Sequence, residues 1–183
     1  MKLGEVGPAN FRQLWWQGGF PASYTAECDR VCAQRQEDFI RTVLERDLPQ
    51  LGITIPAATL RRFWMMVAHY HGQKWNAAEL ARSLGTSEPT TRKYLDILSG
   101  MFLVRQLPPW FENVGKRQVK APKTYVRDSG LLHSLMKLDG FSTMEAHPKL
   151  GASWEGFAQP LFSRRPIATL AELKQRRPLR STL

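Results

Sequence analysis

The chain has 183 residues, which suffice for one generous domain or for two small domains that share a core. Hydrophobic residues make up 43% of it and charged residues 23%, a balance too apolar for a disordered protein, and its longest apolar run is too short to cross a membrane. The formal net charge is +10, which alone is a weak signal because many proteins with such an excess bind no nucleic acid.

The positive charge is unevenly distributed along the chain. Residues 72–127 contain 10 basic and 4 acidic side chains, and residues 159–183 contain 6 basic and 1 acidic. By contrast, residues 1–71 carry a net charge of +1 and residues 128–158 a net charge of −2. A central basic block and a basic terminal segment indicate a polyanionic partner such as double-stranded DNA.

The chain shows neither a metal-binding pattern nor an export signal. Cys28 and Cys32 lie four residues apart in a segment of helical character, and no second pair completes a metal site. We therefore expect two reduced thiols, no metal and no cofactor. Because the first residues lack the apolar core of a secretory signal, we expect a cytoplasmic protein that does not bind membranes.

Residues 1–72 are predicted to form a helical region. A short helix begins at Pro8 and is stopped by Gly-Gly-Phe-Pro at 18–21. A longer helix covers residues 30–47 and is ended by Pro49 and Gly52. Three of its charged residues are placed to face water, namely Arg41, Glu45 and Arg46.

A third helix is predicted to have Pro56 in its first turn and to end at Gly72. One apolar stripe marks its buried face, formed by Leu60, Phe63, Trp64 and Val67. His69 and His71 point about 200° apart on a helix, so they cannot easily share a metal ion. We assign these histidines a structural or surface role.

Residues 75–95 have the pattern of a helix-turn-helix. Asn76 is predicted to cap a first short helix, Gly85 permits a left-handed turn, and Ser87 caps a second helix with Pro89 in its first turn. The positions expected to face inward are apolar, namely Leu80, Ala81, Leu84, Leu95 and Leu98. Spacing, caps and turn residue agree, so we predict this motif.

The start of the second helix carries candidate contacts to DNA. Thr90, Thr91, Arg92 and Lys93 are short polar or cationic side chains of the kind that phosphates and base edges require. Thr91 stands where such motifs usually carry an aliphatic anchor, so the two helices are expected to pack more loosely than usual.

Two strands and a basic loop follow, as in a wing. Residues 102–107 and 123–127 are predicted to be strands, and the loop between them carries three further candidate contacts, Lys116, Arg117 and Lys120. Such loops run along phosphates, where each neutralised phosphate adds salt-dependent affinity. A helix over residues 128–138, capped by Asp128 or Ser129, ends this region.

Several stretches match a known pattern in the same order. They are residues 14–21 (Leu-Trp-Trp-Gln-Gly-Gly-Phe-Pro), residues 39–47, the helix-turn-helix, residues 125–133 and residues 151–157 (Gly-Ala-Ser-Trp-Glu-Gly-Phe). Together they resemble the uncharacterised C-terminal domain of a family of prokaryotic AAA+ ATPases. The resemblance covers residues 3–158 and implies a P-loop ATPase domain before this region and a restriction-endonuclease-like domain after it.

The chain departs from that pattern at both ends. It contains no Gly-x-x-x-x-Gly-Lys-Ser/Thr loop to hold nucleotide phosphates. Glu155 matches the family's helix glutamate, but no Asp follows Asp139 to complete a nuclease-like metal site. Glu-Leu-Lys at 172–174 is therefore interpreted as coincidence. Beyond residue 158 the pattern dissolves into a Pro- and Arg-rich tail, as in a truncated or frameshifted gene.

We therefore expect a mainly α fold, in which a helical region precedes a winged helix-turn-helix with a small β-wing. The expected division is a lid-like helical region (1–72), the winged helix (73–138), the start of a lost nuclease-like domain (139–158) and a divergent basic tail (159–183). The first hypothesis is a non-catalytic fragment that binds DNA. The alternatives are a protein-interaction or lid module that contacts an ATPase core, and a nuclease or ATPase subunit completed by another chain.

Overall fold

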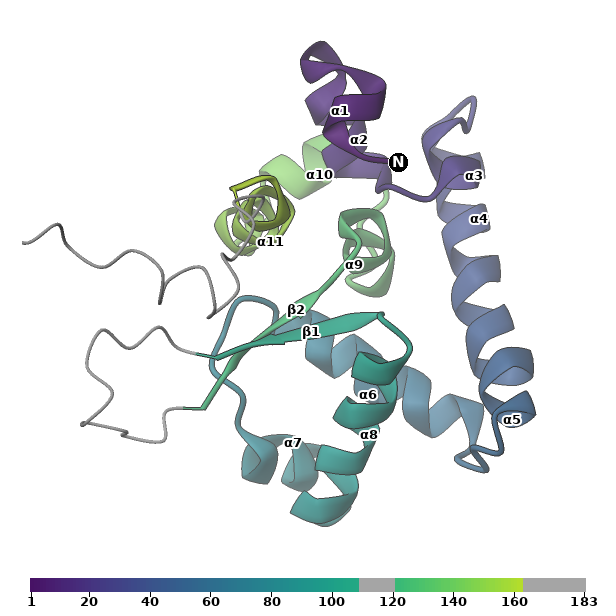
Figure 1. The fold of residues 1–183 in the computed structure, drawn as a ribbon, viewed down its shortest axis with the longest axis vertical. Coiled ribbons are helices and arrows are strands. Elements are labelled where there is room, and N and C mark those ends of the chain that lie inside the picture. The colour runs from purple at the N-terminus through teal and green to yellow at the C-terminus, as the bar shows by residue number, and fades with distance from the viewer. Residues whose placement is uncertain (109–120, 163–183) are drawn as a thin grey trace, which may run out of the picture.

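The computed structural model describes residues 1–108 and 121–162, which form helices around a two-stranded antiparallel sheet (Figure 1). The first half contains α1 (Leu3–Val6), the 3-10 helix η1 (Pro8–Asn10), α2 (Phe11–Gln17), α3 (Pro21–Tyr24), α4 (Asp29–Thr42), the π-helix η2 (Val43–Asp47), α5 (Leu48–Gln50) and α6 (Ala57–His69). The second half contains α7 (Ala77–Leu84), α8 (Glu88–Gly100), β1 (Val104–Leu107), β2 (Lys123–Val126), α9 (Ser129–Leu135), α10 (Phe141–Glu145) and α11 (Leu150–Phe162). The expected mainly α fold with a small β element is confirmed.

The long helix of the first half extends beyond its predicted end. Helix α4 continues through the π-helical turn η2 into α5, so helical structure runs from Asp29 to Gln50. Pro49 lies in the first turn of α5, directly after the π-helical turn, and does not stop the helix. Gly52 follows with a φ of +77°, and the chain turns there. The expectation that Pro49 ends the helix was therefore wrong, and the one for Gly52 is confirmed.

Helix α6 provides the centre of the hydrophobic core. Its apolar stripe is fully buried as predicted, and Pro56 immediately precedes the helix. The core cluster runs without a break from Trp15 on α2 to Met144 on α10 and includes residues of α7, α8 and both strands. The helical first half and the segment from α7 to β2 therefore share one core.

The sheet contains an additional pairing that the sequence analysis did not predict. Strands β1 and β2 pair with Val104 opposite Val126 and Leu107 opposite Lys123. On the other edge of β2, the chain between α6 and α7 pairs through a bridge between Lys74 and Lys123. The Gly72 N–H donates to the Thr124 carbonyl across 2.8 Å, so β2 lies between β1 and the segment 72–75.

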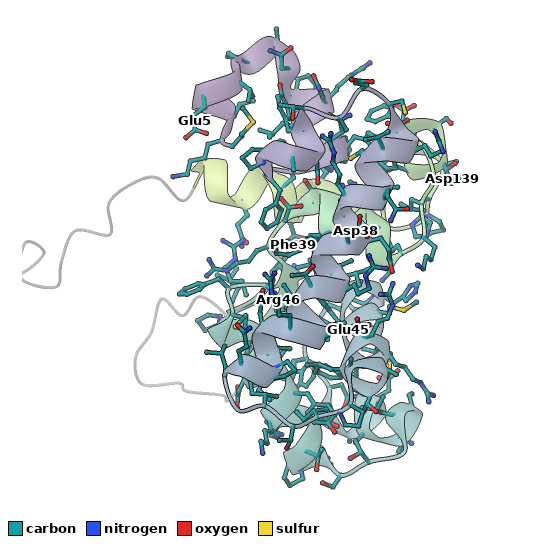
Figure 2. The ribbon with its side chains drawn as sticks, turned by 90° about the vertical axis from the view of Figure 1, so that its right-hand side faces the viewer. Glu5, Asp38, Phe39, Glu45, Arg46 and Asp139 are labelled. Atoms are coloured by element: carbon teal, nitrogen blue, oxygen red, sulfur yellow. The ribbon has the colours of Figure 1, made fainter. Side chains whose placement is uncertain are left out.

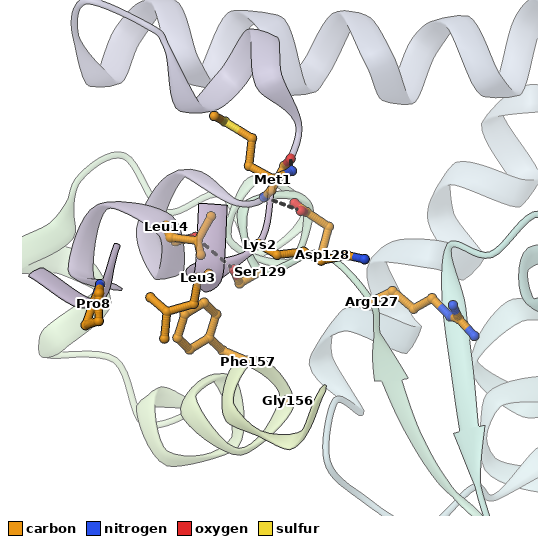
Figure 3. Close-up of a pocket in the computed structure, with 12 residues that line it drawn as sticks. Met1, Lys2, Leu3, Pro8, Leu14, Arg127, Asp128, Ser129, Gly156 and Phe157 are labelled. Atoms are coloured by element: carbon orange, nitrogen blue, oxygen red, sulfur yellow. Dashed lines mark hydrogen bonds between the residues drawn. The ribbon is translucent and has the colours of Figure 1, made fainter. Parts of the chain in front are cut away.

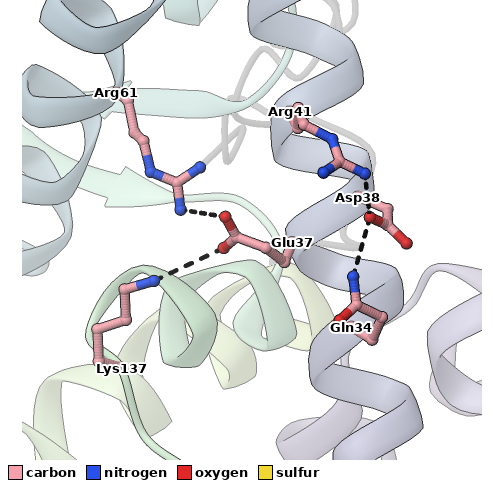
Figure 4. A network of polar contacts seen from close by, with 6 residues as sticks. All are labelled: Gln34, Glu37, Asp38, Arg41, Arg61 and Lys137. Carbon is pink, nitrogen blue, oxygen red and sulfur yellow. Dashed lines mark hydrogen bonds and ion pairs between the residues drawn. The ribbon is translucent and has the colours of Figure 1, made fainter.

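Arg41, Glu45 and Arg46 are exposed as predicted, the last two on η2. Helix α4 crosses one face of the molecule (Figure 2). Its Glu37 carboxylate joins three parts of the fold (Figure 4), because it pairs with Arg61 of α6 and lies 3.7 Å from Lys137 after α9. Arg41 and Asp38, 2.6 Å apart, form a separate pair on the outer side. The Glu37 network therefore holds α4 against α6 and α9.

The predicted wing loop and the basic tail lie wholly or partly outside the described residues. The wing cations Lys116, Arg117 and Lys120 belong to the segment 109–120, and most of the basic tail belongs to residues 163–183. Helix α11 continues to Phe162, so the first residues of the expected tail are helical. Its described part packs on α2, where the Trp15 and Trp154 rings lie 4.9 Å apart.

Candidate nucleic-acid interface

Helices α7 and α8 are joined by a tight turn whose signals were predicted correctly. The Glu79 N–H donates to Asn76 Oδ1 across 3.2 Å, and the Thr90 N–H donates to Ser87 Oγ across 3.3 Å. Gly85 has a φ of +72°, a left-handed conformation that glycine adopts without strain. These caps fix the start of α8 relative to α7, and Leu80, Ala81, Leu95 and Leu98 are buried between them and the core as expected.

The four candidate contacts on α8 do not share one environment. Arg92 and Lys93 are exposed, and Thr90 is half-buried with its hydroxyl 2.8 Å from that of Ser87. Thr91, in contrast, is 0% exposed, and its hydroxyl donates to the Ser87 carbonyl across 3.1 Å. The structure therefore corrects the sequence analysis at Thr91, because a fully buried side chain cannot reach DNA.

The exposed surface of α7 and α8 carries both signs of charge. Arg92 lies 3.8 Å from Glu88, one turn earlier on the same helix. The Arg92 side chain is 62% exposed and that of Glu88 is 50% exposed. Glu79 and Asp96 are also exposed. Lys93 makes no ion pair with the described residues, which leaves its ammonium available to an anion.

Two cations near this surface were missed by the sequence analysis. Lys74, in the segment that pairs with β2, and Arg82, in the last turn of α7, are both exposed. Both belong to the basic block of residues 72–127 that the sequence identified, so the charge distribution was a usable signal. The place of Lys74 follows from the pairing of residues 72–75 with β2, which the sequence did not indicate.

Two other cations of the basic block, Lys123 and Arg105, bind side chains of α11. The Glu155 carboxylate accepts hydrogen bonds from Lys123 Nζ at 2.9 Å and from the Tyr125 hydroxyl at 2.7 Å. Burial alone would raise the pKa of Glu155, but these two hydrogen bonds together with nearby positive charge, chiefly that of Lys123, lower the pKa overall. Arg105 donates to Gln159 and lies over the Tyr125 ring. The helix glutamate of the family resemblance thus binds the hairpin.

Two buried histidines link the hairpin and α9 to neighbouring helices. The Val126 N–H donates to His71 Nδ1 across 3.1 Å, and His133 lies 3.1 Å from the Trp16 carbonyl and 2.7 Å from the Ser153 hydroxyl. Burial lowers the pKa of each histidine to about 4. Both imidazole rings are therefore uncharged near neutral pH. Their buried hydrogen bonds indicate a structural role, which is the role expected for His71.

The motifs of the family resemblance meet in space where α2 ends and α9 begins. Asp128 caps α9 by accepting from the Leu131 N–H at 2.9 Å, and its other oxygen accepts from the Gly19 N–H at 2.7 Å. A Cβ on Gly18 would lie 2.3 Å from Asp128 Oδ1, and one on Gly130 would lie 2.3 Å from the Gln17 carbonyl oxygen. These glycines are needed for the close approach.

The described residues offer little for metal chemistry. Among them, no three His, Cys, Asp or Glu side chains gather closely enough to hold a metal ion. Cys28 is exposed, whereas Cys32 is buried, and burial raises the pKa of its thiol to about 11. No helix in this part of the chain is both long and apolar enough to span a bilayer.

Comparison with known proteins places the chain among related sequences. The uncharacterized protein Mb2031c of Mycobacterium bovis and the uncharacterized protein Rv2008c of Mycobacterium tuberculosis are each 54% identical to it over 153 residues, or 84% of this chain and 35% of theirs. The chain thus spans about a third of the length of these curated relatives. No solved structure matches it significantly. Residues 8–142 match the family model described as a domain of unknown function, DUF8612, and the chain therefore belongs to the DUF8612 family.

Proposed function

We propose that α6 to β2 form a winged helix that binds double-stranded DNA through the N-terminal half of α8. In this proposal Arg92 and Lys93 lie at the mouth of the major groove and Thr90 contacts a phosphate or a base edge. In the same proposal, the wing cations Lys116, Arg117 and Lys120 contact phosphates along the DNA backbone. The chain itself acts as a binding module without catalysis, in the cytoplasm.

The order of elements and the strand pairing support this assignment. A winged helix has a helix, a short strand, two helices in a helix-turn-helix and a β-hairpin, and the last strand lies between the other two. Here α6, residues 72–75, α7, α8, β1 and β2 follow in that order, and β2 lies between β1 and residues 72–75. The capped turn at Gly85 supports the helix-turn-helix part.

The observation that carries the DNA-binding proposal is the exposure of Arg92 and Lys93 near the capped N-terminus of α8. The N-terminal end of a helix attracts anions through the helix dipole. Exposed Lys74 and Arg82 add positive charge from the two neighbouring segments. This arrangement favours a polyanion over a neutral partner.

We further propose that the module is part of a AAA+ family ATPase system. The family resemblance supports this context, and the longer mycobacterial relatives leave room for further domains in such proteins. The 183 residues contain no P-loop sequence, so we expect ATP hydrolysis to require a P-loop domain outside them.

A protein-interaction or lid module that contacts an ATPase core is the second candidate. It is favoured by the acids on the same surface, because Glu79, Glu88 and Asp96 are all exposed on α7 and α8. Such a mixed surface suits a protein partner better than a uniformly basic one does. In that case the winged helix is a scaffold and DNA is not bound.

A fluorescence-anisotropy titration with labelled duplex DNA at two salt concentrations distinguishes the two candidates. We expect weak binding that falls steeply with salt, and a loss of at least about tenfold in the double variant Arg92→Ala/Lys93→Ala. The matched control is Arg41→Ala/Arg46→Ala, which removes two exposed cations from α4 and η2, and it should change affinity by no more than about twofold.

Equal losses of DNA affinity in both double variants would show that binding depends only on the overall charge of the protein. That result would contradict the α8 assignment. Absence of binding at low salt would favour the protein-interaction candidate. A second comparison uses Lys116→Ala/Arg117→Ala, which should cost less than the α8 variant because groove-facing residues are more desolvated than a loop along phosphates.

A further inference from the structure

Phe102 occupies an unusual conformation at the end of α8. Its N–H donates to the Ser99 carbonyl and the Leu103 N–H donates to the Leu98 carbonyl, each across 3.0 Å, so the helix closes with a left-handed residue. That residue has a φ of +57°, where glycine is preferred, and its side chain is 70% exposed. The ring is therefore disfavoured by backbone strain and by exposure, and it adds little to the core.

Arg127, which lies over this ring, and the nearby Arg105 lack an acidic partner. The Arg127 guanidinium lies 5.2 Å from the Phe102 ring centre, and the Arg105 guanidinium lies 5.7 Å from that of Tyr125. Burial, and then repulsion by Arg127, lower the pKa of Arg105, so the two guanidinium groups are close enough to repel. Neither forms an ion pair with any carboxylate in residues 1–108 or 121–162.

Arg127 also lines two adjoining hollows, one of which is shown in Figure 3. The larger, of about 480 Å³, has an apolar wall formed by Leu3, Leu14 and Phe157. The smaller, of about 250 Å³, has an apolar wall formed by Phe20, Phe102 and Leu131. Gly19, Arg127 and Asp128 line both, and we call the pair the Arg127 groove.

More basic than acidic side chains line the Arg127 groove. Asp128 is the one acid among its lining residues in the described part of the chain, and the oxygens of Asp128 already accept the Gly19 and Leu131 N–H groups. Lys2 adds a second cation to the lining of the larger hollow. A ligand that complements this groove therefore carries a carboxylate between two apolar groups.

We propose that the Arg127 groove binds an extended segment of a partner protein in which an acidic residue is flanked by apolar residues. Alternate side chains of an extended chain share one face and lie about 7 Å apart, so one carboxylate can meet Arg127 while its neighbours enter the two hollows. The groove adjoins the C-terminal end of α8, roughly 18 Å along the helix from Glu88. A protein partner and DNA can therefore bind together, and this inference does not depend on the DNA proposal.

Selection from a displayed library of random peptides of about nine residues tests the proposal, because that length spans both hollows. The full 183-residue chain is the bait, and a parallel selection uses Arg127→Glu. We expect wild type to enrich peptides with Asp or Glu two residues from Leu, Ile or Phe on either side. The Arg127→Glu variant should not enrich these peptides. It should bind the best of them only after the acidic residue of the peptide is replaced by Lys.

Phe102→Gly separates recognition from folding. Glycine relieves the left-handed strain, so this variant should unfold at a higher temperature while it binds the best peptide at least about tenfold more weakly. Leu51→Ser is the control, because Leu51 is 64% exposed elsewhere, and it should leave peptide binding unchanged.

Enriched peptides without an acidic residue, or undiminished binding by Phe102→Gly, would overturn the proposal. Two further results would also overturn the proposal, because each would identify a different ligand of the groove. One is a dimer in sedimentation velocity that dissociates in Phe102→Gly, which would identify a second copy of the chain. The other is oligothymidine binding that both groove variants lose while no peptide is enriched, which would identify single-stranded nucleic acid.

Discussion

The Glu88 carboxylate lies 3.8 Å from the Arg92 guanidinium, one turn apart on the exposed side of α8. The side chains are 50% and 62% exposed, so water screens the pair and its contribution to stability is small. Its effect on a polyanion is larger, since the carboxylate neutralises Arg92 and repels phosphates. Glu88 therefore opposes binding at the position where the proposed interface is most basic.

Replacing Glu88 with Gln should strengthen DNA binding. We expect the affinity to rise about threefold at low salt, because one repulsive charge is removed and Arg92 is released. The variant should lose at most about 0.5 kcal/mol of stability, since an acid in the first turn favours the helix dipole. Anisotropy titrations measure the affinity. Glu145→Gln on α10 is the control with the same charge change, and an equal gain there would argue against a local effect.

Thr91→Val should leave DNA binding unchanged and stabilise the fold. The hydroxyl is fully buried, and the Ser87 carbonyl that accepts from it also accepts the Thr91 N–H across 3.0 Å. An isosteric methyl group therefore loses one redundant hydrogen bond and gains apolar burial, which should raise the free energy of unfolding by about 0.5–1 kcal/mol. Urea titration measures this. Thr90→Val is the comparison, because it should weaken DNA binding a few-fold if Thr90 contacts DNA.

The elements that could be predicted from the sequence depend on contacts close along the chain. The Asn76 and Ser87 caps join residues three apart, and Gly85 needs only its own backbone freedom. The apolar stripe of α6 is likewise a local pattern. In contrast, the Gly19–Asp128 hydrogen bond joins residues 109 positions apart, and no local pattern indicates it.

The candidate site was harder to predict for two physical reasons. Four consecutive residues on a helix span more than one turn, so the run from Thr90 to Lys93 had to place a member inward, and Thr91 is that residue. In addition, a count of charges along the sequence does not show which cations form ion pairs within the fold. Lys123 counted toward the basic block, yet it pairs with Glu155 from a helix 32 residues later.

Gly18→Ala should destabilise the protein strongly because two effects add. Gly18 has a φ of +80°, and a Cβ there would lie 2.3 Å from Asp128 Oδ1. Gly52→Ala isolates the first effect, since Gly52 has a φ of +77° and no atom within 4 Å of the added Cβ. We expect about 1 kcal/mol for Gly52→Ala and at least about 3 kcal/mol for Gly18→Ala. Urea unfolding followed by tryptophan fluorescence tests this, and equal losses would contradict the close approach.

The buried histidines predict how stability depends on pH. His71 and His133 have ordinary pKa values of 6.5 when unfolded and about 4 when folded. The unfolded chain therefore binds more protons between these values, so stability is fully present above pH 6.5 and falls as the pH drops toward 4. From these values we expect each histidine to remove about 2 kcal/mol between neutral pH and pH 5.

His71→Asn assigns part of this loss to one side chain. The Asn carbonyl can accept the Val126 N–H that His71 Nδ1 accepts now, but it does not titrate. The variant should be less stable than wild type at pH 7.5, because a smaller side chain leaves a cavity, and its stability should fall by about 2 kcal/mol less on acidification to pH 5. Asp128 has a raised pKa from burial and changes stability in the opposite direction, but it is present in both proteins and cancels in the comparison. Urea titrations at the two pH values give the slopes. Parallel slopes would show that His71 does not stay neutral in the folded protein.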